Sequence, residues 1–412
     1  MLSPNPISLL CAIILSLPLA LLFTISDHSS SSSTTTTTTT VAATVDLHKN
    51  TNTIPTISTA NNINAQSQPR QEQQPSYFHL EKTRNTTTQT RTNRATKPLR
   101  APLEPDDDRL LRVASGVSAK PSSPPKVAFM FLTTTPLPFA PLWDRFFLHA
   151  PPHLFTVYVH ADPTYNYTPS FGGVFSGRVI PFSKPTRRNT PSLALAARRL
   201  LAHALVDDPA NSMFVLLSPA CIPLRSFDFI YNFLVRSGRS FVEVLKNEKT
   251  ARGRYEARGE HAMLPEVKFD RFRVGSQFWV LTRAHARVMA RDRALWTKFG
   301  LPCLPERADA CYPEENYFPT VVSMADTRGA VVPATLTHVD WQGRWDGHPR
   351  AYNASEIGAE LVGRLRRLRP RYGSEVVERW DPFLFARKFE PECLQALMNI
   401  ADEVIFGERV CD

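Results

Sequence analysis

The chain has 412 residues, of which 42% are hydrophobic and 21% charged, and its formal net charge is +10 at pH 7. The basic residues lie in no recognisable nucleic-acid-binding motif, so this charge is weak evidence for a nucleic-acid partner. Length and composition instead favour a chain that contains one large globular domain and does not bind nucleic acid.

The chain begins with an apolar segment that is long enough to cross a membrane. Residues 7–25 carry no charge, and about 20 apolar residues span a bilayer as a helix. A cleaved signal peptide would have a shorter apolar core after a basic start. We therefore predict that residues 1–28 form a short tail and an uncleaved signal anchor, in which Pro18 is tolerated.

A polar segment follows. Residues 29–40 are all Ser or Thr, and sequence rich in Asn, Gln and Thr continues to about residue 125. Such a composition buries too little apolar surface to offset the chain entropy lost on folding. We predict a disordered stem over residues 29–125. Sequons for N-glycosylation occur at Asn85, Asn166 and Asn353, which favours a lumenal location for the remainder of the chain.

Residues 126–412 are expected to form one globular domain. Apolar runs at residues 127–132, 155–160 and 213–217 predict buried strands, and residues 192–206 predict a helix with one apolar face. Such strands alternating with helices indicate an α/β fold, with a mostly parallel sheet covered by helices on both faces. Ligands of these sheets bind beyond the carboxyl ends of the strands.

Five cysteines lie beyond the apolar segment, an odd number that leaves at least one thiol unpaired in an oxidising lumen. Cys303 and Cys311 are close in sequence and could form a disulfide, with Cys393 and Cys411 as the next candidate pair. Cys221 would then carry the free thiol. The sequence contains no CxxC motif or His/Cys cluster that would suggest a zinc site.

Two adjacent carboxylates, Glu314 and Glu315, follow Pro313 inside a run of aromatic and apolar residues. Apolar surroundings disfavour the charged form of a carboxylate and raise its pKa toward neutral pH. Such a carboxylate can act as a general base toward a sugar hydroxyl. The simpler interpretation is an acidic helix N-terminus, where carboxylates interact favourably with the helix dipole.

Nine short motifs, taken in order, resemble the plant branch of the core-2/I-branching β-1,6-N-acetylglucosaminyltransferase family. Each motif is weak by itself, and the resemblance runs from about Lys126 to the C-terminus. The motifs are KVAFMFLT at residues 126–133, VHAD at 159–162, ARRLL at 197–201, LLSPACIPL at 216–224, GRY at 253–255, GSQFW at 275–279, PEE at 313–315, HVDW at 338–341 and LFARKF at 384–389.

The resemblance implies a GT-A-like fold in a single-pass type II Golgi membrane protein with a lumenal catalytic domain. It implies transfer of N-acetylglucosamine or a related sugar from a UDP-sugar to a glycan hydroxyl, with inversion and without a divalent metal or other cofactor. The only Asp-x-Asp motif is Asp106-Asp107-Asp108, in the expected stem. A cation must then stabilise the departing UDP. Lys388 matches the family's lysine at the diphosphate, and Arg366 is the favoured second cation.

The same resemblance assigns the other site residues. They are Glu315 as general base, Asp162 and Ser276 at the donor, and Glu243, Trp341 and Arg254 at the acceptor. Asp162 could instead cap a helix, and Trp341 could instead belong to the core. The segment Gly275-Ser276-Gln277 would let the backbone approach the substrate closely or would form a plain turn.

Two departures from the family pattern lie near the donor side. Arg188 and Asn189 stand where the family usually has Trp-Gly, and Ala197 stands where it usually has Glu. These departures favour an alternative, a catalytically silent lumenal glycan-binding or scaffold protein on the same fold, whereas Glu315 and Lys388 favour the enzyme. A secreted hydrolase is a poor third interpretation, because a typical glycosidase needs two carboxylates that flank the scissile bond.

Overall fold

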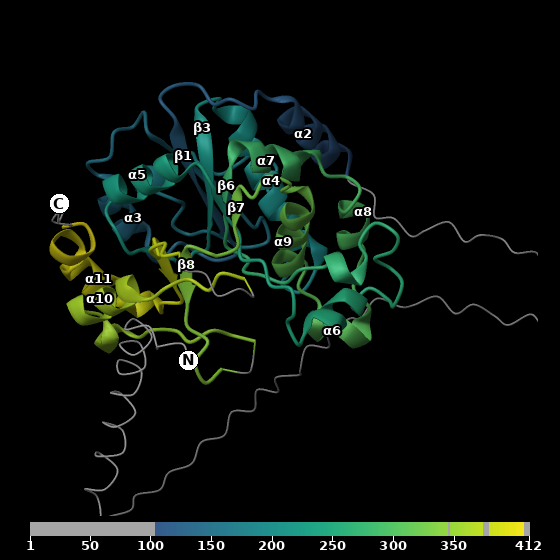
Figure 1. Cartoon of the computed structure of the whole chain (residues 1–412). Coiled ribbons are helices and arrows are strands. Elements are labelled where there is room, and N and C mark those ends of the chain that lie inside the picture. Colours follow the sequence, from purple (N-terminus) through teal and green to yellow (C-terminus); the bar gives the residue numbers. More distant parts are fainter. Residues whose placement is uncertain (1–103, 345–346, 374–378, 408–412) are drawn as a thin grey trace, which may run out of the picture. The chain divides into compact units, whose positions relative to one another are not determined.

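The computed structural model of the chain describes residues 104–344, 347–373 and 379–407 (Figure 1). The expected anchor at residues 7–25, the sequon at Asn85 and the thiol of Cys411 lie outside these ranges. Among the described residues, no helix combines the length and the apolar character that a bilayer span requires.

A six-stranded sheet forms the centre of the domain, in the order β2-β1-β3-β6-β5-β7. Its strands are β1 (Lys126–Thr133), β2 (Phe155–Ala161), β3 (Asn211–Leu217), β5 (Ser240–Phe241), β6 (Val280–Thr282) and β7 (Val331–Val332). Only β6 runs opposite to its neighbours in this sheet, because it pairs antiparallel with both β3 and β5 while the other pairs are parallel. The expected mostly parallel α/β sheet is confirmed.

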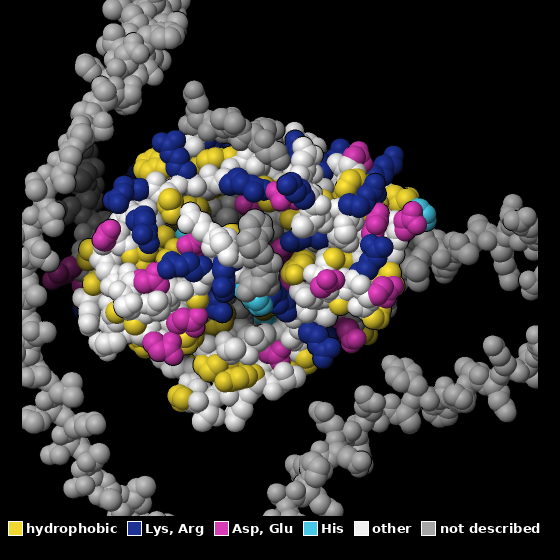
Figure 2. Space-filling model, turned by 90° about the horizontal axis from the view of Figure 1, so that it is seen from below, with side chains coloured by type: hydrophobic (Ala, Val, Ile, Leu, Met, Phe, Trp, Pro, Cys, Tyr) yellow, Lys and Arg dark blue, Asp and Glu magenta, His cyan; other side chains and the backbone are white. Residues whose placement is uncertain are grey.

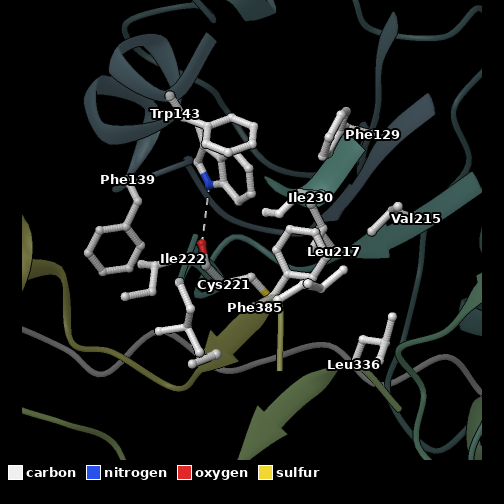
Figure 3. Close-up of a cluster of buried hydrophobic side chains, with 14 of the residues drawn as sticks. Phe129, Phe139, Trp143, Val215, Leu217, Cys221, Ile222, Ile230, Leu336 and Phe385 are labelled. Atoms are coloured by element: carbon white, nitrogen blue, oxygen red, sulfur yellow. Dashed lines mark hydrogen bonds between the residues drawn. The ribbon is translucent and has the colours of Figure 1, made fainter. Parts of the chain in front are cut away.

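Side chains alternate along each strand and fill two apolar layers. Phe129 and Phe131 of β1 pack in one layer with α3 (Ala140–Phe147) and α5 (Phe227–Ser237). Figure 3 shows part of this layer, where the Trp143 indole donates a hydrogen bond of 3.2 Å to the Cys221 carbonyl. This layer therefore holds the turn after β3 against α3.

The second apolar layer lies on the other face of the sheet. Met130 of β1 packs there with helices from three parts of the chain. These are α4 (Pro191–Asp207), α7 (Arg283–Arg291) and α9 (Pro313–Ala325). Figure 1 shows them opposite α3 and α5. The sheet is therefore covered by helices on both faces, as the sequence predicted.

A second, smaller sheet contains three strands. Its order is β4-β9-β8, with β8 and β9 parallel. Its strands are β4 (Ile222–Pro223), β8 (Thr337–Val339) and β9 (Phe385–Arg387), and the nearby helices are α10 (Ala359–Arg367) and α11 (Leu394–Asn399). The remaining elements are α6 (Ala251–Glu256), α8 (Trp296–Phe299) and short 3-10 or π-helical turns at Gly173–Phe175, Phe269–Arg271, Pro305–Ala310, Ala354–Glu356, Pro391–Cys393 and Ala401–Ile405.

The folded domain begins earlier than the sequence suggested. Helix α2 (Pro105–Gly116) lies inside the expected stem of residues 29–125, yet it packs against α4 and α7. Leu111 and Ala114 are buried in the second apolar layer. Composition misses this helix because a short apolar stripe is hidden among charged residues, and its partners come from distant parts of the chain.

The structure confirms part of the predicted pairing of the cysteines and contradicts another part. Cys303 and Cys311 form a disulfide. Cys221 is a buried free thiol, as predicted. Cys393 is also free and buried, which contradicts its proposed pairing, and its thiol lies 3.1 Å from the Tyr352 carbonyl. Closeness in sequence predicted the first pair correctly, whereas it was misleading near the C-terminus, where Cys393 packs into the core.

Helix α2 gives a direct test of the revised domain boundary. Leu111→Ala should lower the free energy of unfolding by about 2–5 kcal/mol, because it leaves a cavity in the apolar layer. Val113→Ala on the same helix is the matched control, since Val113 is 53% exposed and Leu111 only 1%. Chemical denaturation of both variants would measure the difference, and equal stability would contradict the placement of α2 in the folded domain.

Candidate active site

The candidate site residues gather at one edge of the central sheet. Asp162 follows β2 directly and Glu243 lies two residues after β5, both at carboxyl ends of parallel strands. Because β6 runs the other way, the chain that enters it, including Ser276, approaches from the same edge. This is the edge where ligands of parallel α/β sheets bind.

Glu315 occupies the first turn of α9, which Pro313 opens. Its Oε2 accepts a hydrogen bond of 2.6 Å from Nη1 of Arg254 in α6, and 26% of its side chain is exposed. Its backbone carbonyl accepts a hydrogen bond from the Gly275 N–H at 2.9 Å. The contact with Arg254 fixes the position of the Glu315 carboxylate.

Glu314 differs sharply from its neighbour. It is only 3% exposed, and its Oε2 has no hydrogen-bond partner among the described residues. Burial raises the pKa of Glu314 to about 8, and the charge of Glu315 raises it further, against the lowering effect of Arg188 and Arg254. The raised pKa expected within the pair is therefore found at Glu314, which is protonated at neutral pH.

At this edge of the sheet, the backbone of Gly275 lies against the backbone of Glu243. A side chain at Gly275 would collide with the Glu243 carbonyl, so glycine is required for contact between two backbone segments rather than for approach to a substrate. Ser276 accepts a hydrogen bond from the Phe278 N–H at 3.1 Å, as in a local turn. Burial raises the pKa of Glu243 to about 7, while Arg371 opposes this shift.

Lys388 and Trp341 lie at the same end of the second sheet. The register pairs Val339 of β8 with Arg387 of β9, so Trp341 and Lys388 both follow the ends of parallel strands. Trp341 is 50% exposed, which excludes a simple core role. Within the described ranges, no ion pair joins the Lys388 ammonium to a carboxylate.

Two predicted donor residues are engaged in holding the fold together. Arg366 donates from Nε to the Leu224 carbonyl at 2.7 Å and from Nη2 to the Ile405 carbonyl at 2.9 Å. The guanidinium therefore ties α10 to two other segments, and we no longer assign Arg366 to the diphosphate. The sequence could not show this, because both acceptors are backbone atoms distant in the chain.

Asp162 is likewise occupied by its own loop. It is 3% exposed, and Oδ1 accepts hydrogen bonds from the N–H and hydroxyl of Thr164, at 2.8 and 2.6 Å. Oδ2 accepts from the N–H and hydroxyl of Thr186, at 2.7 and 2.8 Å. Burial alone would raise the pKa of Asp162, but these bonds outweigh it and lower the pKa. These four bonds hold the loop, and no helix begins at Asp162, so the alternative of a helix cap is wrong.

Sequence reasoning missed two cations of this region. Arg387 stands beside Lys388 in the LFARKF motif, and its guanidinium lies 4.7 Å from the centre of the Phe278 ring. Arg188 appeared only as a departure from the family pattern, yet its Nη2 donates to the Gly347 carbonyl at 2.6 Å. Figure 2 shows Lys and Arg side chains gathered around a hollow on the face of the molecule seen from below.

The described sequons are exposed. Asn166 lies in the loop after β2, and Asn353 caps a short 3-10 turn, where its side chain accepts a hydrogen bond from the Ser355 N–H. Both side chains are therefore accessible to a glycosylating enzyme, whereas Asn85 lies outside the described residues.

Comparison with known proteins establishes the class. The sequence model of the Branch family, described as Core-2/I-Branching enzyme, matches residues 127–366. The chain is 31% identical over 300 residues to Glycosyltransferase BC10 of Oryza sativa subsp. japonica, an alignment that covers 64% of this chain and 73% of the relative. The chain belongs to the Core-2/I-branching enzyme family, and this membership supports a glycosyltransferase, as its motifs indicated.

The buried carboxyl predicts a pH-dependent stability. The folded-state pKa of Glu314, about 8, lies above its ordinary value of 4.5. Its protonated form therefore contributes stability that is complete below about pH 4.5 and is lost as the pH rises through about 8. Glu314→Gln removes this loss, so its free energy of unfolding relative to wild type should increase between pH 5 and pH 8.

Chemical denaturation at several pH values would measure this change. Glu360→Gln, at an exposed position in α10, controls for removal of a negative charge. The difference between its free energy of unfolding and that of wild type should increase less with pH. If this difference for Glu314→Gln stays constant or decreases with pH, Glu314 is ionised in the folded protein.

Proposed function

We propose that the protein is an inverting, metal-independent glycosyltransferase that moves a sugar from a UDP-sugar to a hydroxyl of a glycan. N-acetylglucosamine or a related sugar is the proposed donor group. The observation that carries this proposal is the placement of Glu315, a partly exposed and ion-paired carboxylate, at the ligand-binding edge of the sheet. Family membership supplies the reaction class.

In the proposed reaction, the acceptor oxygen attacks the anomeric carbon as the bond from that carbon to the diphosphate oxygen breaks. The bonding electrons leave with UDP, and the acceptor proton passes to Glu315. Arg254 holds the carboxylate in place through its 2.6 Å contact. Glu314 is too buried to serve as this base, because only 3% of it is exposed.

The developing charge on UDP needs a cation, and Lys388 is the proposed one. Lys388 follows β9, and the neighbouring parallel strand β8 leads to exposed Trp341, which is suited to pack on an acceptor sugar. The Asp-x-Asp motif is engaged elsewhere. Asp106 and Asp107 contact Lys184 and Arg199, and Asp108 contacts Arg112 and Arg293. The proposal therefore assigns no metal to these carboxylates.

The departures from the family pattern are structurally accommodated, which supports the enzyme over a silent scaffold. Asn189 adopts a positive φ of 62°, a conformation that asparagine tolerates better than most residues. Ala197 is buried, and Arg199, two residues later in α4, takes its carboxylate partners from α2. Neither departure removes Glu315 or Lys388.

The proposed location is the Golgi membrane, with a single type II anchor at residues 7–25 and the transferase domain in the lumen. The uncharged apolar segment, the exposed sequons and the Cys303–Cys311 disulfide support this proposal. Its partners would be a UDP-sugar and a glycan or glycoprotein acceptor.

The role of Glu315 can be tested by removing its proton-accepting ability while keeping its shape. Glu315→Gln should lower kcat by about 10²–10⁴-fold with nearly unchanged UDP affinity, because Lys388 holds the diphosphate elsewhere. Glu314→Gln is the matched control and should change kcat far less. Transfer assays with a panel of UDP-sugars and glycan acceptors would measure both, and equal losses would contradict the division of roles.

The role of Lys388 can be tested by binding alone. Calorimetry with UDP in EDTA should show binding to the full-length protein, and Lys388→Ala should weaken it by about 10-fold or more, since charge-assisted hydrogen bonds contribute about 1.5–3 kcal/mol. Arg366→Ala should weaken UDP binding far less. A strict requirement for Mn²⁺ or Mg²⁺ would overturn the proposed metal independence.

A further inference from the structure

Arg188 lies in a segment that the fold holds in place. The N–H and the hydroxyl of Thr186 both donate to Oδ2 of Asp162, at 2.7 and 2.8 Å, so the backbone is fixed two residues before Arg188. Asn189 then adopts a positive φ of 62°, and α4 begins soon afterwards. The fold therefore determines where the Arg188 side chain starts, although that side chain itself is exposed.

The Arg188 guanidinium joins this segment to residues that lie about 160 positions later in the chain. Nη2 donates to the Gly347 carbonyl at 2.6 Å, and Nη1 lies 2.9 Å from Nδ1 of His348. Because a guanidinium can only donate hydrogen bonds, the imidazole nitrogen is the acceptor. One side chain thus holds two consecutive residues of a distant segment.

The neighbouring Arg187 shows that such contacts are not a general feature of this segment. Arg187 is exposed, as Arg188 is, and its backbone N–H and carbonyl bond locally to Ser192 and Thr190. Within the ranges that the structure describes, no hydrogen bond or ion pair involves the Arg187 guanidinium. Of the two adjacent arginines, only Arg188 reaches residues 347–348, so the two provide a matched pair for experiment.

Residues 347–350 connect the contact with Arg188 to the residue that precedes Trp341. The Arg350 N–H donates to the Asp340 carbonyl at 2.9 Å, and Nη1 of Arg350 lies 3.7 Å from Oδ2 of Asp340. Asp340 comes directly before Trp341 in the sequence. The short segment is therefore held at one end by Arg188 and at the other end beside Trp341.

Gly347 also lies close to the side chains that surround the candidate general base. A Cβ atom placed on Gly347 would lie 3.5 Å from the Tyr312 hydroxyl, and the Tyr312 ring lies 4.5 Å from the guanidinium carbon of Arg254. Arg254 in turn donates to Glu315 at 2.6 Å. Gly347 is therefore linked through two side chains to the carboxylate that accepts the proton in the proposed reaction.

We propose that Arg188 is a positioning residue for the acceptor. By holding residues 347–350, it fixes the position of Trp341, the proposed surface for an acceptor sugar, relative to Glu315, the proposed base. The acceptor hydroxyl must meet the base and the anomeric carbon together, and a small misplacement of reacting groups lowers the rate. This inference rests on the proposed function and extends it to a residue that the sequence presents only as a departure from the family pattern.

Hydrogen exchange of the full-length protein, followed by mass spectrometry, tests the positioning role without any substrate. Arg188→Ala should speed exchange of the Arg350 N–H about 10-fold, because loss of the two guanidinium contacts releases one end of its segment. Arg188→Lys should restore most of the protection, since an ammonium can still donate to the Gly347 carbonyl. Arg187→Ala is the matched control and should exchange as wild type does. Thermal unfolding verifies that each variant is folded.

Transfer assays test the consequence for the acceptor. Arg188→Ala should raise KM for the glycan acceptor about 10-fold and lower kcat less. Its UDP affinity, measured by calorimetry, should stay unchanged, because Lys388 is the proposed contact of the diphosphate. Arg188→Lys should recover most of the lost acceptor affinity, and Arg187→Ala should resemble wild type. A variant that is merely less stable would instead unfold at a lower temperature and would not be rescued selectively for the acceptor.

Three results would overturn the inference. They are unchanged exchange at Arg350 in Arg188→Ala, faster exchange with an unchanged KM for the acceptor, and weaker UDP binding with an unchanged KM for the acceptor, which would place Arg188 at the donor. The proposed function fails separately. A wild-type protein that transfers sugar from no UDP-sugar would exclude the transferase and the acceptor role with it, whereas the exchange data alone would still decide whether Arg188 holds residues 347–350.

Discussion

Where β5 and β6 leave the central sheet, the backbone of Gly275 lies directly against the carbonyl of Glu243. The N–H of Gly275 also donates to the Glu315 carbonyl, so one residue without a side chain joins β5, the approach to β6 and the first turn of α9. Any larger residue would push these segments apart. The relative positions of Glu243, Ser276 and Glu315 all depend on this contact.

The reversed direction of β6 makes that contact possible. If β6 were parallel to β3 and β5, the chain entering it would approach from the opposite edge, and Ser276 would lie far from the carboxyl ends of the other strands. Instead, the start of one strand meets the ends of its neighbours. The second sheet then brings Arg387 over Phe278, only a few residues beyond Gly275.

The electrostatic character of the site follows from unequal burial of its acids. Glu314 and Glu243 have raised pKa values because burial disfavours their charged forms, whereas Glu315 lies beside Arg254 and is partly exposed. Two adjacent residues in one helical turn therefore differ in burial and in their polar contacts. The result is a carboxylate paired with a guanidinium directly beside a buried carboxyl group.

Helix α2 extends the folded domain beyond the region that the family model matches, which begins at residue 127. Asp107, which is only 1% exposed, contacts both Lys184 and Arg199 at 3.1 Å. Lys184 belongs to the segment that carries Thr186 and Arg188. A helix outside the matched region thus helps to hold the segment that carries Thr186 and Arg188.

The sequence by itself determined the strands β1 to β3, helix α4, the mostly parallel sheet, the Cys303–Cys311 disulfide and the family. These features depend on local periodicity, closeness in sequence or short motifs, all of which can be recognised from the sequence alone. Only the tertiary structure decided that Glu314 is the buried member of its pair, that Arg366 and Asp162 hold the fold together, and that Cys393 is free. Each of these depends on partners from distant parts of the chain, and burial, hydrogen bonding and charge interaction are set by those partners rather than by the residue type.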